Sequence, residues 1–176
     1  MSALRLINET VADTSTTSIN ILDVFSADFD IYKIVSTLHF ITNEDDIHIR
    51  YIDNSNTVIS SSNYDTASVM LRSSNGWLER PLTRVNIDNG GYFTLVDGDE
   101  GGGTVEYVFN PFSSSTYTYG VSQSSGYLQG YGLYGLKTMR VLKQTTSITG
   151  LNFYNGNGSS NFGGGSVKIY GLRVDS

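Results

Sequence analysis

The sequence contains no cysteine and only two prolines among its 176 residues. Without cysteine the chain can form no disulfide and has neither a thiolate nucleophile nor a thiolate metal ligand. Charged residues make up only 16% of the chain. No apolar run approaches the roughly 18 residues that a membrane-spanning helix needs. These absences exclude a disulfide-stapled domain, and we expect no contact with a membrane.

The few charges that are present are mainly acidic, with a formal net charge of -6 and a pI near 4.7. Lysine and arginine are scattered and form no cluster. Nucleic-acid binders need a basic patch to neutralise phosphates, so we expect no nucleic-acid partner. Residues 1–6 lack a basic segment followed by an apolar core, so we also expect no signal peptide.

Glycine and aromatic residues are abundant, with 19 glycines, 12 tyrosines and 8 phenylalanines. Together with the many serine, threonine and asparagine residues, this composition disfavours helices and favours a twisted, loop-rich β protein. A chain of this length buries roughly 70% of its unfolded surface as one domain. No shift in composition divides it, so residues 1–176 are predicted to form a single β-sandwich domain.

Alternation of apolar and polar residues predicts about nine short strands, with turn signals every 8–12 residues or so. No segment keeps a helical period, although residues 64–72 could form either a short helix or an irregular strand. This pattern predicts an all-β fold, a two-sheet antiparallel sandwich. Jelly-roll topology is favoured because immunoglobulin-like folds have fewer strands and shorter chains. Another sandwich topology and a barrel or prism are the alternatives.

The clearest predicted strand pair flanks the polar turn at residues 43–46. Apolar residues share one parity on each side of this turn, and we expect both sets to face one core. The implied hairpin places Phe40 opposite Ile49 and Leu38 opposite Tyr51. His39 and His48 would then lie on its outer face.

The last strand begins after a run of three glycines. Val167 and Ile169 share one face, whereas beyond Gly171 the apolar positions change parity to Leu172 and Val174. One inserted residue would keep a single face buried, so Gly171 is predicted to be a bulge. We expect this strand to lie inside a sheet, close to the first strand.

The segment Gly130–Gly135 matches the glycine-rich pattern of dinucleotide-binding loops. Such a loop must follow a strand and open a helix, and residues 136–144 are poor helix formers. We instead interpret residues 126–135 as an aromatic loop that meets a protein partner. Stacking on sugar rings and packing over the end of the sandwich are the alternatives.

Five aromatic residues are the candidate contacts for a partner, because tyrosine and tryptophan provide large contact areas at interfaces. A lone tryptophan in a loop-like stretch is also compatible with a core or lid residue. The candidates are Tyr127, Tyr131, Tyr134, Trp77 and Phe112.

No metal, cofactor or catalytic residue is predicted. Asp97, Asp99 and Glu100 share a glycine-rich loop, but the spacing of calcium loops is incomplete and we interpret it as a solvated acidic loop. His39 and His48 are the only histidines. In the expected hairpin they lie beside Arg50, whose positive charge would repel a metal cation. Neither is near a conspicuous serine motif, so a catalytic triad is not expected.

Four segments carry a resemblance to a known group of proteins: Ser2–Thr10, Asp23–Ile34, Tyr107–Phe112 and Gly165–Leu172. They resemble small virion proteins of tailed bacteriophages from marine and cyanobacterial hosts. The most specific parts are the strand followed by Asn-Pro-Phe and the final strand ending in Tyr-Gly. The resemblance implies a non-enzymatic jelly-roll structural subunit of the virion, either a capsid decoration or cement protein or a tail component.

This resemblance implies the major capsid protein or other virion proteins as partners. We expect a homo-oligomer, with a trimer preferred because local threefold positions of a shell suit such a subunit, and a dimer next. The alternative is a tail or fibre-associated module that binds host surface glycan. A hydrolase on the same fold would need two carboxylates about 5–10 Å apart in a cleft.

Overall fold

The computed structural model describes residues 4–41, 45–73, 80–87, 92–96, 101–128, 132–156, 158 and 160–172. Every regular element in these ranges is a strand, which confirms the predicted all-β class, and residues 64–72 form a strand rather than a helix. These ranges contain fourteen strands, instead of the roughly nine predicted. They are β1 (Leu4–Val11), β2 (Ser18–Ile21), β3 (Ile31–Ser36), β4 (His39–Phe40), β5 (Asp45–Asp53), β6 (Tyr64–Arg72), β7 (Arg80–Ile87), β8 (Tyr92–Val96), β9 (Gly102–Phe109), β10 (Thr118–Leu128), β11 (Gly132–Leu142), β12 (Ile148–Asn155), β13 (Phe162–Gly164) and β14 (Ser166–Leu172).

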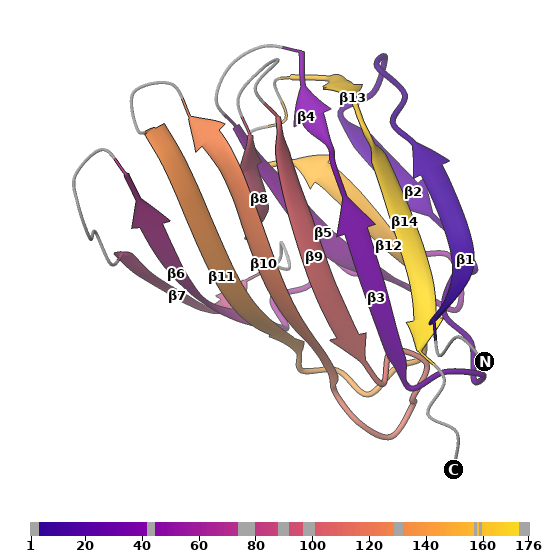
Figure 1. Ribbon diagram of the computed structural model, residues 1–176. Coiled ribbons are helices and arrows are strands. Elements are labelled where there is room, and N and C mark those ends of the chain that lie inside the picture. The colour runs from indigo at the N-terminus through magenta and orange to yellow at the C-terminus, as the bar shows by residue number, and fades with distance from the viewer. Residues whose placement is uncertain are drawn as a thin grey trace.

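The strands form two stacked antiparallel sheets and one small strand pair. The larger sheet has eight strands in the order β1-β14-β3-β9-β10-β11-β6-β7, and the smaller has four in the order β2-β12-β5-β8. Strands β13 and β4 pair separately. In Figure 1 the eight-stranded sheet faces the viewer and the four-stranded sheet lies behind it. The protein is therefore a β-sandwich, as the sequence predicts.

The pairing of eight of these strands follows a jelly roll. Counted along the chain, β1, β2, β3, β5, β8, β9, β12 and β14 are the first to the eighth. The first pairs with the eighth, the second with the seventh, the third with the sixth and the fourth with the fifth. A long hairpin wrapped into two sheets gives this nested pairing, the topology of two Greek keys.

Two additional hairpins widen the larger sheet. Strands β6 and β7 are inserted between the fourth and fifth jelly-roll strands, and β10 and β11 between the sixth and seventh. Each pair is antiparallel, and β10 adds to β9 while β6 adds to β11. The four-stranded half of the jelly roll thus becomes an eight-stranded sheet.

The main apolar core fills the space between β14 and β3 of the larger sheet and β12 and β5 of the smaller one. Ile34, Ile169, Ile49 and Phe153 are all at most 1% exposed. Burial of each such side chain stabilises the fold by about 1.5–3 kcal/mol. A separate apolar cluster lies at the far end of β11.

The predicted hairpin between residues 32–40 and 47–51 is wrong. Leu38 and Phe40 are buried as expected, but Phe40 pairs with Phe162 and their rings stack at 5.2 Å. Ile49 and Tyr51 lie on β5, which pairs with β12 and β8 in the other sheet. The chain crosses between sheets after β3, and parity reveals burial but not the sheet to which a strand belongs.

His48 is also not on an exposed surface. It lies on the outward side of β5, yet it is only 5% exposed. Its ring Nδ1 is 3.4 Å from the Tyr154 hydroxyl oxygen, and the backbone at Gly156 leaves no room for a side chain against the ring. His39 packs against Gly163 and Gly164 instead.

Two strands end close to polar residues that have a left-handed backbone conformation. Strand β2 ends at Ile21, and Asp23 then takes a left-handed backbone conformation with φ of 55°. Strand β9 ends before Asn110, which has φ of 53°. Asparagine and aspartate tolerate this conformation better than other non-glycine residues.

The final strand β14 lies between β1 and β3, as predicted, but it has no bulge at Gly171. Its register with β3 is continuous, with Gly171 opposite Tyr32. Glycine is required there because a Cβ atom would lie 2.6 Å from the Phe29 ring. The register shift occurs in the neighbouring strand β1, at Ile7. Val174, used to predict the bulge, lies outside the described residues.

Replacing Gly171 by alanine should destabilise the protein by about 1–3 kcal/mol, because the Phe29 ring would have to move. In a Phe29→Ala background the same change should cost much less. Urea unfolding of the four proteins measures this coupling. Gly103→Ala is the control and should be nearly neutral, since nothing lies within 4 Å of its added Cβ. Equal costs in both backgrounds would contradict the assigned contact.

Candidate functional site

The outward side of the eight-stranded sheet is rich in exposed apolar residues. They alternate along the strands with residues that face the four-stranded sheet. Leu133 and Met139 are 60% and 54% exposed. We call this surface the outer face, and its exposed large apolar side chains are Leu4, Leu6, Val11, Val69, Leu71, Tyr107, Tyr119, Tyr127, Leu133 and Met139. Surfaces of this kind mark interaction sites.

A groove of about 760 Å³ crosses the outer face at a right angle to the strands. On one side lies a row of residues in register from β3 to β6. This row is Val35, Val105, Gln123, Lys137 and Val69. A second hollow of about 540 Å³ continues the groove past Leu133 and shares Leu71, Ser125 and Gly135 with it.

Small residues form the second row of the groove. Gly103, Ser125 and Gly135 are neighbours across β9, β10 and β11. A Cβ atom on Gly103 would meet nothing within 4 Å, and one on Gly135 would meet only the Ser124 carbonyl oxygen at 3.9 Å. Neither glycine has a positive φ. The fold therefore does not require glycine at these positions, where it leaves the backbone open to close approach by another molecule.

The charges on the outer face differ from those of the whole chain. Lys168 forms an ion pair with Glu9 at 3.1 Å. Lys33 and Lys137 also point outward, and no carboxylate among the described residues forms an ion pair with either. The outer face is therefore apolar and locally cationic on a chain whose net charge is -6.

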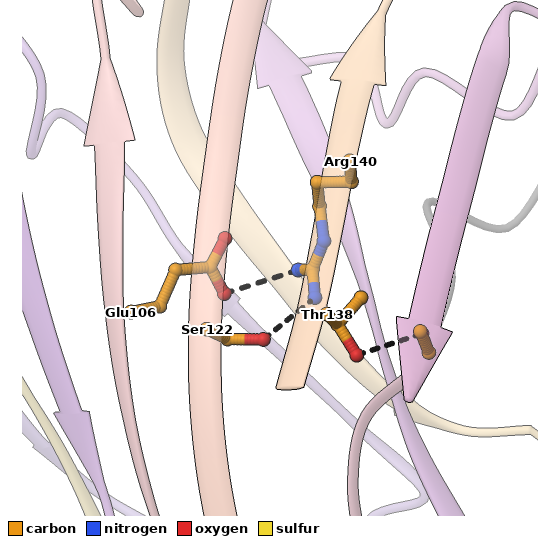
Figure 2. Close-up of polar contacts among 5 residues, drawn as sticks. Glu106, Ser122, Thr138 and Arg140 are labelled. Atoms are coloured by element: carbon orange, nitrogen blue, oxygen red, sulfur yellow. Dashed lines mark hydrogen bonds and ion pairs between the residues drawn. The ribbon is translucent and has the colours of Figure 1, made fainter. Parts of the chain in front are cut away.

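A polar layer lies on the opposite, buried side of the same strands. The Arg140 Nη1 atom donates a hydrogen bond to Glu106 Oε2 at 3.0 Å, and Arg140 Nη2 lies 3.4 Å from the Ser122 hydroxyl. Figure 2 shows that these side chains reach across β10 from β9 and β11. Ser68 and Thr138 share a hydrogen bond of 2.8 Å beside them.

Glycine at position 120 makes room for this ion pair. A Cβ atom there would lie 2.6 Å from Glu106 Oε1 and 3.2 Å from the Tyr51 hydroxyl. Burial raises the pKa of Glu106, and the attraction of Arg140 opposes that rise. Burial also raises the pKa of Tyr51 well above its ordinary value, with the Glu106 charge adding to the effect. Tyr51 therefore stays neutral beside the ion pair.

The buried polar layer supports the fold and is closed to a substrate. Glu106 and the Arg140 side chain are at most 1% exposed, so no substrate reaches them. Within the described ranges, no group of three or more histidine, aspartate or glutamate residues could hold a metal ion. The same ranges contain no helix that is long and apolar enough to cross a membrane. The predicted acidic loop at Asp97, Asp99 and Glu100 lies outside the described residues.

The five predicted contact residues do not form one surface. Tyr127 is 47% exposed on the outer face, but Tyr134 is buried against Gly126 and is wrong as a contact residue. Residues 126–128 and 132–135 are the ends of two strands rather than a loop. Phe112 is exposed, but it lies before the start of the eleven-residue strand β10, whereas Tyr127 lies near the end of that strand. Tyr131 and Trp77 lie outside the described residues.

Sequence reasoning missed the apolar residues of β6 and β11. The sequence of residues 136–144 shows no clean apolar face. The reason is that Thr138 and Arg140 occupy inward positions in the polar layer, while Leu133 and Met139 point outward. Apolar residues at both parities were the available signal for a strand with two apolar surfaces.

Comparisons with known proteins give little similarity. No protein-family model matches the sequence, and no curated protein matches it. Among solved structures, a single mutant of congerin II has 8% identity and a TM-score of 0.34, over 92% of this chain and 99% of that one. An alginate lyase from Alteromonas sp. 272 has 11% identity and a TM-score of 0.19, over 98% and 95%. Likeness this slight bears on neither fold nor function.

The polar layer gives a prediction about stability. Glu106→Leu or Arg140→Met alone should destabilise the protein by about 3–5 kcal/mol, because each leaves a buried charge without its partner. The double variant should cost much less than the sum of the two. Urea unfolding measures all three.

The exposed pair Lys143–Asp65, at 2.8 Å, is the matched control. Breaking it with Lys143→Met should cost less than about 1 kcal/mol because solvent screens both charges. Additive costs for Glu106→Leu and Arg140→Met would contradict the proposed coupling between these two residues.

Proposed function

We propose that this chain is a non-enzymatic structural subunit of a phage particle, a capsid decoration or cement protein that attaches through the outer face. The observation that carries the proposal is the extent of that face, where exposed apolar side chains extend across the sheet from β1 to β6. Leaving so much apolar surface in water is costly unless a partner covers it. The resemblance to phage virion proteins supports the particle context.

The expected partner is a virion protein with an apolar and acidic surface, with the major capsid protein as the first candidate. Lys33 and Lys137 would meet acidic groups around the apolar contact, while the net charge of -6 would keep free subunits apart. Three copies around a local threefold position of the shell would add interface area and stabilise it. A dimer is the next assembly to consider.

Particles assembled without this subunit provide the test. Purified protein is added, the particles are sedimented, and the bound copies are counted. Leu71→Asp should reduce binding at least about tenfold, because a carboxylate would be buried against an apolar partner. Leu71 is 43% exposed, so an aspartate at this position is compatible with folding.

Leu22→Asp is the matched control, since Leu22 is 42% exposed and lies outside the eight-stranded sheet. It should bind like the unchanged protein. Equal loss with both variants, or no loss with Leu71→Asp, would refute attachment through the outer face. Circular dichroism confirms that both variants are folded.

A further inference from the structure

The outward side of the four-stranded sheet carries a hollow of different chemistry. It has a volume of about 430 Å³ and lies over β2, β12 and β5. Side-chain amides, hydroxyls and one guanidinium line it, and no carboxylate is present among the lining residues that the structure describes. Asn20, Asn152 and Arg50 lie in register across the three strands. Among the described lining residues, Arg50 is the charged one.

The polar groups of this hollow are held in place before any ligand arrives. The Arg50 guanidinium carbon lies 4.1 Å from the centroid of the Tyr154 ring, a cation–π contact. The Asn152 amide donates a hydrogen bond of 2.8 Å to the Asn20 side-chain oxygen. With that bond formed, the side-chain NH₂ group of Asn20 and the side-chain oxygen of Asn152 are available to a ligand. Fixed side chains lose little entropy on binding.

The border of the hollow is also fixed. Asn155 is 2% exposed, and its amide donates to the Ser160 carbonyl oxygen at 3.0 Å. Its side-chain oxygen accepts a hydrogen bond from the Gly158 backbone at 2.9 Å. These two bonds hold Gly158 and Ser160 close to the end of β12. The hollow is thus a built polar site rather than a gap between mobile side chains.

We propose that this hollow binds a saccharide unit that carries a carboxylate, such as a sialic or uronic acid. Neighbouring sugar hydroxyls both donate and accept hydrogen bonds, as do the amides of Asn20 and Asn152. The planar guanidinium of Arg50 suits a carboxylate, which it binds through two parallel hydrogen bonds. This site lies on the other sheet from the outer face, so it does not depend on the proposed function.

Titration of the full chain with sialyllactose and with digalacturonate tests this site, with neutral lactose for comparison. The readout is the ¹⁵N–¹H shift of the side-chain amides of Asn20 and Asn152 and of Arg50 Nε. We expect both acidic sugars to shift these resonances. Arg50→Gln should weaken binding about tenfold, through loss of a charge-assisted pair. Asn20→Ala should weaken it by a smaller factor.

Lys33→Gln is the matched control, because it removes one positive charge from the other sheet. It should leave the affinity unchanged. The proposal is overturned if neither acidic sugar shifts the three side chains, or if Arg50→Gln and Lys33→Gln weaken binding equally. Equal affinity for lactose and the acidic sugars overturns the requirement for a carboxylate. Thermal unfolding confirms that the variants keep their fold.

Discussion

The ion pair between Glu106 and Arg140 is the interaction on which the widened half of the eight-stranded sheet depends. It joins β9 of the jelly roll to β11 of an inserted hairpin, and it crosses β10 where Gly120 lacks a side chain. Along β11 the inward residues change from apolar to polar and back again, so this layer separates two apolar clusters. A buried ion pair that must keep its two members together allows few alternative registers.

This constraint explains how one sheet can be apolar on its outward side and still keep a unique arrangement. In an ordinary sandwich strand, apolar residues mark the inward side and thereby set the register. Strands β9 to β11 carry exposed apolar residues such as Met139 as well, so hydrophobicity alone would not choose between their sides. The buried ion pair and the hydroxyls around it determine which side of these strands faces inward. The outer face then presents its groove on a fixed support.

The all-β class and the sandwich could be predicted from the sequence, because both follow from the alternation of apolar and polar residues and the absence of a helical period. The position of the last strand inside a sheet, next to the first strand, was also predicted. The pairing partners of the strands could not be predicted in this way, because the parity of Phe40 does not reveal that its strand β4 pairs outside the larger sheet. The need for glycine at position 171 arises from the ring of Phe29, which is distant in the sequence and unrelated to any bulge. The candidate site was only partly found, because Tyr134 and Tyr127 look equivalent until the register assigns them to opposite sides.

The central claim is that the larger sheet, rather than the smaller one, attaches to the particle. Because the chain has no cysteine, single cysteines introduced by Lys137→Cys on the outer face and Ser60→Cys beside the polar hollow can be labelled individually. The decisive measurement is the rate of maleimide labelling of free and particle-bound subunits. We predict strong protection at position 137 on binding and little change at position 60. Protection at position 60 alone, or at neither position, would contradict the account.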